Sequence, residues 1–179
     1  MRQTRLALLF LIVCAALPFR AIAAEDSPSI EQQFNTAYKA FRTAEQVNNA
    51  EAQHQHATEA LRLGSDLFEA ESQTLAVLTM NAALAYPTAW GFLPAHTALP
   101  LMRRLVTRYE SLFGQDSIDV IEPLLLLAET LTAYSLHAVP DESTADARTR
   151  ILDTETEIAS LSQRIYHLTK SFGPNIDAA

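Results

Sequence analysis

The stretch around Gly114 combines a helix stop with a helix start, and it limits the possible folds more than any other feature of the sequence. Its residues are Leu112-Phe113-Gly114-Gln115-Asp116-Ser117-Ile118-Asp119-Val120. Glycine ends a helix readily because it adopts the left-handed conformation without steric cost. Asp116 or Ser117 can cap the next helix, and Asp119 places negative charge in its first turn. The pattern predicts two antiparallel helices joined by a tight turn.

Similar patterns occur before and after this turn. Phe68 is followed by a possible cap at Ser72, and Phe172 is followed by Gly173-Pro174-Asn175. The three phenylalanines Phe68, Phe113 and Phe172 are separated by 45 and 59 residues. Repeats of roughly 20 to 50 residues are typical of stacked helical pairs. The spacing is irregular but lies near this range, so it favours a repeat architecture, and the third pattern is expected to end the last helix near Phe172.

Apolar residues recur at helical spacing through most of the chain, and no stretch has the sustained alternation of a strand. Ser29 and Gln32 have the spacing of a capping box, Asn48-Asn49 interrupts the pattern, and Gly64 is expected to be a weak point or a site of close packing. The segment 87–94, which contains the only tryptophan, is expected to fold back over the helices. We predict an all-α fold of about six helices, at about 30–47, 50–68, 72–86, 97–113, 117–137 and 145–172.

The first 23 residues have the pattern of a cleaved signal peptide. Arg2 and Arg5 precede a 14-residue apolar run over 6–19, and Ala21-Ile22-Ala23 fits a cleavage site. Such a run spans about 21 Å as a helix, against roughly 30 Å for a membrane core, which disfavours an uncleaved anchor. We expect cleavage after Ala23, a single domain over 24–179 without stable membrane insertion, and a periplasmic or secreted location.

The chain without residues 1–23 is acidic and contains no cysteine. It keeps 156 residues and loses three arginines but no acidic residue, so its formal charge changes from −8 to −11. An acidic surface disfavours nucleic acid and anionic membranes as partners. Because Cys14 is the only cysteine, the domain is expected to have no disulfide, no thiolate chemistry and no cysteine-based metal site.

No motif of catalytic chemistry accompanies the acidic residues. His54 and His56 are two residues apart, so on a helix they point about 200° apart and do not chelate one ion. The sequence has no glycine-rich phosphate loop and no nucleophile motif. We therefore expect a protein that is not an enzyme, with no catalytic residue, no metal and no cofactor.

One basic cluster interrupts the acidic chain, formed by Arg103, Arg104 and Arg108. Salt bridges to Glu110 or to neighbouring acidic helices are the expected use of these arginines. A phosphate or an acidic partner is the alternative.

Two helical segments, 75–86 and 119–128, resemble the first helix of tetratricopeptide (TPR) repeats. The long-repeat variant of kinesin light chains is the most similar, because its pairs are joined by a Leu-Gly-Pro-Asp-His-Pro-Asp-Val-Ala turn. The turn at 113–120 keeps the glycine, both aspartates and the valine, whereas Glu69-Ala70 replaces Gly-Pro in the first copy. The resemblance implies antiparallel helix pairs stacked as a short right-handed α-solenoid, closed by a terminal cap at 145–172.

The resemblance also implies that a partner binds at the concave face, which is lined by the first helix of each pair. The family uses an asparagine there to hold the backbone of a bound peptide, and Asn81 falls on that position, whereas the second copy has Leu126. The predicted groove is apolar with acidic points and suits an apolar or basic segment. Its predicted residues are Val77, Met80, Asn81, Leu84, Glu122, Leu125, Leu126 and Glu129. A hydrogen bond to a neighbouring loop is the alternative role for Asn81, and plain core is the alternative for 124–127.

Two functions from different classes follow. The first is an exported adaptor or scaffold that binds a segment of another exported protein or a peptide in this groove, without catalysis. The second is a self-assembling helical structural protein, because apolar residues of the last helix recur about every 3.5 residues over 151–172 and can pair with a second copy as a homo-oligomer. Ile158→Asp with Ile165→Asp distinguishes the two, because unfolding by these aspartates indicates that the stripe is core.

Overall fold

The computed structural model describes residues 28–86 and 95–176, and this part of the chain is all-helical. The predicted signal peptide and the predicted 87–94 loop lie outside the described residues. The helices are α1 (Ile30–Gln46), α2 (Ala50–Leu67), α3 (Gln73–Leu84), α4 (Ala95–Phe113), α5 (Ile121–Leu136) and α6 (Thr144–Ile176), and a 3-10 helix η2 (Ile118–Val120) precedes α5. The predicted fold class of six helices is therefore confirmed.

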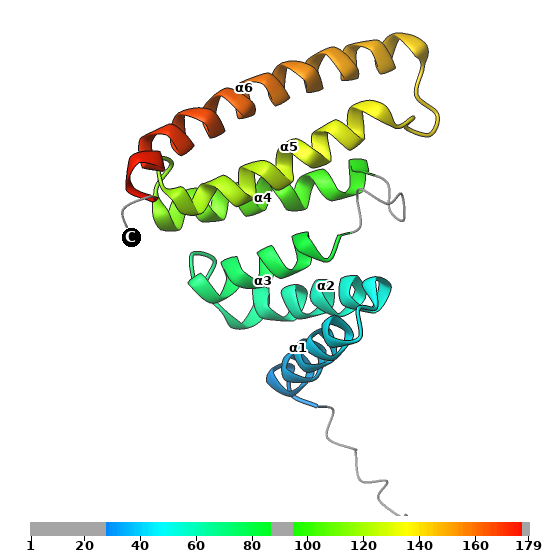
Figure 1. The fold of residues 1–179 in the computed structure, drawn as a ribbon. Helices are drawn as coiled ribbons and strands as arrows, with labels where there is room; N and C mark the ends of the chain where they lie inside the picture. Colours follow the sequence, from blue (N-terminus) through cyan, green and yellow to red (C-terminus); the bar gives the residue numbers. More distant parts are fainter. Residues whose placement is uncertain (1–27, 87–94, 177–179) are drawn as a thin grey trace, which may run out of the picture.

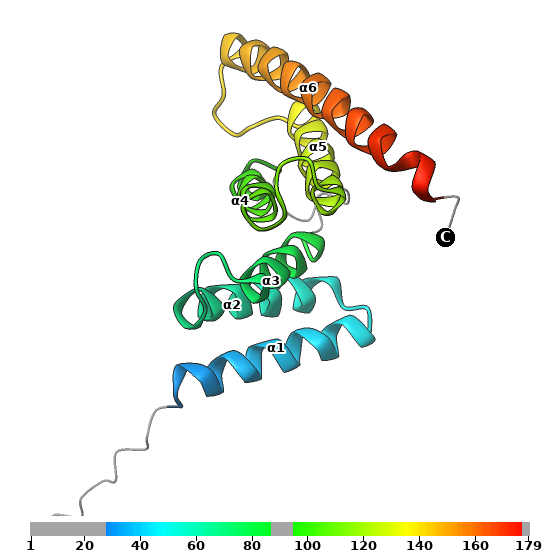
Figure 2. The same cartoon turned by 90° about the vertical axis from the view of Figure 1, so that its left-hand side faces the viewer.

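Each helix packs against the next one along the chain, and α3 also contacts α5. Figure 1 shows the helices stacked in chain order from α1 at the bottom to α6 at the top. Figure 2 shows α4 and α5 next to each other above α3. The stack follows the sequence, so neighbouring helices are also neighbours in the chain.

The core consists of two hydrophobic clusters that share α3. One cluster joins α1, α2 and α3, and it includes Leu75 and Leu78 of α3. The other joins α3 to α4, α5 and α6, and it includes Met80 and Ala83 of α3. The buried residues of α3 contact neighbouring helices on two sides, and Thr74, Val77 and Leu84 remain exposed. Helix α3 therefore connects the two halves of the molecule.

Local capping chemistry determines the first helix boundaries. The Ser29 hydroxyl accepts from the Gln32 backbone N–H at 3.2 Å, and the Gln32 side chain accepts from the Ser29 N–H at 2.9 Å, so the predicted capping box is confirmed. Asn48 has a φ of 51°, in the left-handed region that asparagine tolerates better than most residues. The Asn49 side chain then accepts from the Ala52 N–H at 3.1 Å and caps α2.

The turn around Gly114 ends one helix and starts the next, as predicted. Gly114 has a φ of 88°, and its N–H donates to the Glu110 carbonyl at 2.9 Å. Ser117, and not Asp116, caps η2, since its hydroxyl accepts from the Asp119 N–H at 3.2 Å, and α5 follows without a side-chain cap of its own. The equivalent turn after Leu67 uses Ser72, whose hydroxyl accepts from the Leu75 N–H at 3.2 Å.

The prediction that the last helix ends near Phe172 is wrong. Helix α6 continues through Gly173 and Pro174 to Ile176. Pro174 has no N–H to donate to the Lys170 carbonyl, so α6 lacks one helical hydrogen bond there, and this single loss does not end the helix. A glycine and a proline at the end of a helix therefore do not by themselves start a new turn.

Gly64 allows close packing between α2 and α3. A Cβ atom at this position would lie 2.5 Å from Leu78 Cδ1 and 3.6 Å from the Phe34 ring. Leu78 is itself buried, so its side chain has little room to move away. The close-packing interpretation of Gly64 is the one that the structure supports.

The apolar stripe of α6 packs onto the chain's own core. Four of its residues contact the cluster formed by α3, α4 and α5, namely Ile158, Leu161, Ile165 and Leu168. Two ion pairs reinforce this contact, between Arg103 and Glu157 at 2.8 Å and between Arg164 and Glu110 at 2.6 Å. Intrachain packing therefore accounts for the regular apolar spacing of this helix.

Candidate partner-binding surface

Helix α3 exposes apolar side chains on the side that its packing leaves free. Val77 is 43% exposed and Leu84 is 55% exposed, and Asn81 lies between them and is half-buried. These residues are spaced by four and three positions, which places them on one side of a helix. Met80, which was predicted to belong to the groove, is 8% exposed and belongs to the core cluster.

Helix α5 exposes a matching row. Leu125 is 45% exposed, Glu122 and Glu129 are exposed on either side of it, and Leu126 is half-buried against the core cluster. The row continues at both ends through residues that sequence reasoning missed. These are Ile118, Thr132 and Leu136, all exposed, and the spacing of three and four residues along the helix is the signal that identifies them.

The two rows border the same contact between helices. Met80 of α3 and Leu126 of α5 belong to one cluster, and α3 contacts α5. At about 100° per residue, the exposed row lies roughly 40–100° around the helix from Met80 on α3 and from Leu126 on α5. We call the surface formed by Val77, Asn81, Leu84, Glu122, Leu125 and Glu129 the α3–α5 face.

The charges on this face all have one sign. Helix α3 has no charged residue, and η2 and α5 together have only Asp119, Glu122 and Glu129. Within the described residues, Glu122 and Glu129 form no ion pair. Burial raises the pKa of the neighbouring Tyr109, and Glu122 and Asp119 raise it further. The α3–α5 face is thus apolar and acidic.

Asn81 has no hydrogen-bond partner for its side-chain amide in the part of the chain that the structure describes. Its backbone carbonyl accepts from the Ala85 N–H at 3.0 Å, as in any helix. The predicted alternative, a bond to a neighbouring loop, is therefore not formed by these residues.

The arginines of the basic cluster of α4 differ in their environments. Arg103 forms the ion pair with Glu157 on α6, whereas Glu110 is bound by Arg164. Arg108 donates instead to the Leu75 carbonyl at 3.3 Å and to the Thr79 hydroxyl on α3. Burial, and then the neighbouring Arg104, lower the pKa of Arg108. Arg103 and Arg108 are thus engaged with neighbouring helices.

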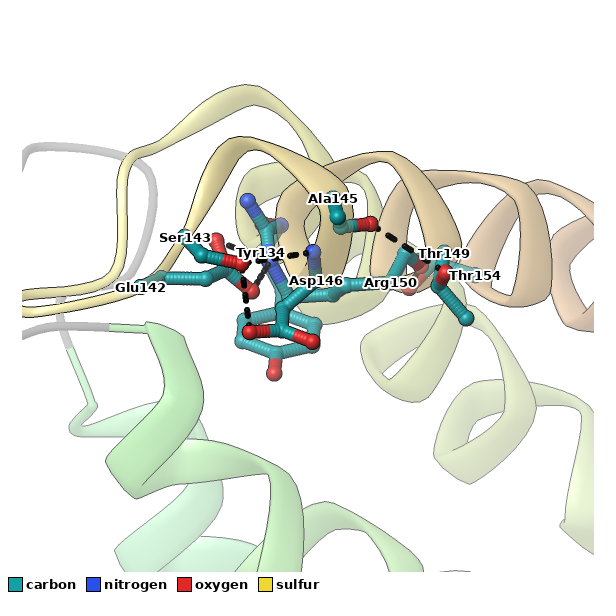
Figure 3. A network of polar contacts seen from close by, with 8 residues as sticks. All are labelled: Tyr134, Glu142, Ser143, Ala145, Asp146, Thr149, Arg150 and Thr154. Carbon is teal, nitrogen blue, oxygen red and sulfur yellow. Dashed lines mark hydrogen bonds and ion pairs between the residues drawn. The ribbon is translucent and has the colours of Figure 1, made fainter.

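A polar network joins the end of α5 to the start of α6, and Figure 3 shows its members. Arg150 Nε donates to the two Glu142 carboxylate oxygens at 2.8 and 3.0 Å, and its Nη1 donates to the Tyr134 carbonyl. The guanidinium also lies 4.8 Å from the centre of the Tyr134 ring. The Arg150 and Glu142 side chains are only 9% and 13% exposed. The network attaches the start of α6 to the end of α5 and to the loop between them.

An open cleft of about 590 Å³ lies beside this network, between α4, α5 and α6. Its walls include Tyr134, Asp153 and the ion-paired Arg103 and Glu157. Among the described residues, no group of three His, Cys, Asp or Glu side chains is arranged to hold a metal ion. In the same ranges, no helix combines the length and apolarity that crossing a membrane requires.

His54 is partly buried at the contact between α2 and the end of α3. Its ring packs edge-on against the Tyr86 ring, with 4.8 Å between the two ring centres. Its Nδ1 atom is buried, and it has no hydrogen-bond partner among the described residues. Burial lowers the pKa of His54 from its ordinary value of 6.5, because a buried imidazolium loses its hydration.

This lowered pKa predicts a loss of stability in mild acid. The unfolded chain binds a proton at His54 more readily than the folded chain does, so stability is full above pH 6.5 and falls as the pH decreases through the folded pKa. His54→Phe is expected to reduce the slope of the unfolding free energy between pH 7 and pH 5, measured by urea unfolding. His56→Phe, on another side of the same helix, is the control. Equal slopes for His54→Phe and the unsubstituted protein would contradict the assignment.

Comparisons with protein-family models, curated proteins and solved structures find no match for this chain. The class of protein is therefore defined by its own architecture. Over residues 28–86 and 95–176, six α-helices are stacked in sequence order, with an apolar and acidic face on α3 and α5.

Proposed function

We propose that the protein is an exported adaptor or scaffold that binds a segment of another exported protein on the α3–α5 face, without catalysis. The observation that carries this proposal is the exposure of Val77, Leu84 and Leu125, at 43, 55 and 45%, around a half-buried asparagine with an unbound amide. The free energy of the system decreases when a partner covers aliphatic side chains that water otherwise surrounds. Export rests on the signal-peptide pattern of residues 1–23.

The TPR-like right-handed solenoid is part of the same proposal. The contact between α3 and α5 supports it, since the first helices of successive pairs meet in such stacks. Ala83, Ala98 and Met102, which match the family's packing positions, are buried in the same cluster. The outer surface of α6 carries mostly polar residues, such as Glu155, Ser162 and Thr169, as expected of a terminal cap.

Self-assembly through 151–172 is the weaker hypothesis. Its motivation was the apolar stripe of the last helix, and Ile158 and Ile165 pack within the chain. Aspartate at both positions is therefore expected to unfold the protein. If the unsubstituted protein is a dimer and the double variant is a folded monomer, the self-assembly hypothesis is supported instead.

The proposed function is tested by cross-linking the protein in living cells and identifying the partner that is captured with it. The test variant carries Val77→Asp and Leu125→Asp. Both side chains are exposed, so the variant is expected to fold, whereas a charge at the half-buried Leu126 would disturb the core. We expect recovery of the partner to fall at least tenfold, because an aspartate covered by an apolar partner surface loses its hydration without gaining a hydrogen bond. The matched control, Leu152→Asp with Tyr166→Asp, changes two exposed residues of α6. Equal recovery with all versions would contradict the proposal.

A further inference from the structure

The distribution of cations shows which charge a partner of the α3–α5 face must carry. All Lys and Arg residues of the described ranges belong to α1, α2, α4 and α6. The only charges on α3, η2 and α5 are the carboxylates of Asp119, Glu122 and Glu129. An acidic partner would meet repulsion along the face, and a basic partner would be attracted.

The exposed residues form a row on each of the two helices. Along η2 and α5 these residues are separated by four, three, four, three and four positions, and they are Ile118, Glu122, Leu125, Glu129, Thr132 and Leu136. On α3 the row is Thr74, Val77, Asn81 and Leu84, with the same alternation. This spacing follows from the helical structure of α3 and α5, and rows of this kind form the ridges against which a third helix can pack.

Along η2 and α5, the apolar and the acidic residues of the row form two separate columns. Ile118 and Leu125 are seven residues apart and form an aliphatic column, and Glu122 and Glu129 form a carboxylate column beside it. From 118 to 136 the row is about 27 Å long at 1.5 Å per residue. A helix of about 18 residues covers this length.

We infer that the segment bound on the α3–α5 face is a basic amphipathic helix of about five turns. Its aliphatic stripe covers Val77, Leu84 and Leu125, and its Lys or Arg side chains lie opposite Glu122 and Glu129. This inference rests on the proposed function and adds the chemistry of the partner. Figure 1 shows α3 and α5, the two helices that carry the face, one above the other in the stack.

The inference is tested with three labelled 18-residue peptides. One has leucines at alternating spacings of three and four residues, flanked by lysines; the second has glutamate in place of each lysine; the third is a scrambled form of the first. Fluorescence anisotropy with the purified protein is expected to give at least tenfold tighter binding for the basic helix than for the other two. Higher salt is expected to weaken this binding, because screening acts on exposed charges.

Charge variants of the protein locate the binding. The double variant Glu122→Gln, Glu129→Gln is expected to bind the basic peptide about fivefold more weakly at low salt. Asp153→Asn with Glu155→Gln removes the same charge from exposed positions of α6 and is expected to leave binding unchanged. Equal weakening by both pairs, equal binding of the basic and scrambled peptides, or no binding at all would overturn the inference.

The proposed function can survive when this inference fails. If the protein captured in cells is cross-linked to Val77 or Leu125 through an acidic or extended segment, the adaptor function stands and the basic helix is rejected. If the basic peptide binds but the captured protein is independent of Val77 and Leu125, the face has the predicted chemistry and the adaptor function is rejected.

Discussion

Replacement of Arg150 by methionine is expected to lower the free energy of unfolding by about 3 kcal/mol, because it leaves a nearly buried carboxylate without its partner. Glu142 is 13% exposed and accepts two hydrogen bonds from Arg150. The Tyr134 carbonyl, one of the last four of α5, also loses its donor. A change of this size corresponds to a decrease in Tm of roughly 6–12 °C for a chain of this length. Circular dichroism during heating and urea unfolding measures both quantities.

The control is Arg148→Met on the same helix. Arg148 is exposed and forms no ion pair among the described residues, so its replacement is expected to change stability by less than about 0.5 kcal/mol. The double variant Arg150→Met, Glu142→Leu is expected to recover most of the loss, since an apolar pair needs no charge compensation. A loss below about 1 kcal/mol for Arg150→Met would show that the network does not fasten α6.

Helix boundaries were predictable from the sequence where a single local interaction determines them. Ser29, Asn49, Ser72 and Ser117 each bond a backbone N–H two or three residues ahead. Gly114 ends its helix because its own φ is positive. None of these depends on a distant part of the chain.

The interactions between helices were not predictable in the same way. Arg103 binds Glu157 and Arg164 binds Glu110, in both cases across 54 residues, and the sequence does not show which helix faces align. The same limit applies to the end of α6, which a local pattern placed too early. Sequence identifies possible donors and acceptors, but packing selects the pairs.

The candidate site illustrates both situations. Val77, Leu84 and Leu125, which were predicted to line a partner-binding groove, are exposed, and their binding role stays a prediction. Met80 is buried because α3 is used on two sides, by α1 and α2 and by α4 and α5. The family pattern gives a position along a helix, and the actual exposure depends on how neighbouring helices cover it.

Leu105→Ala is expected to cause the largest loss of stability, about 3–4 kcal/mol, from lost transfer energy and the cavity left behind. Leu105 is 0% exposed and lies on α4, in the hydrophobic cluster to which α3, α4, α5 and α6 all contribute. Chemical denaturation measures the loss. Leu152→Ala removes the same atoms from a side chain that is 63% exposed and is expected to have little effect.

The location of the loss also tests how the two clusters are coupled. Leu105 belongs to one cluster, and α1 and α2 belong to the other. In a stack in which each helix pair contacts only its neighbours, a local defect spreads weakly. Hydrogen exchange is therefore expected to speed up in α4, α5 and α6 of Leu105→Ala, while α1 and α2 keep more of their protection. An equal increase in exchange in all six helices would instead mean that α3 couples the clusters into one cooperative unit.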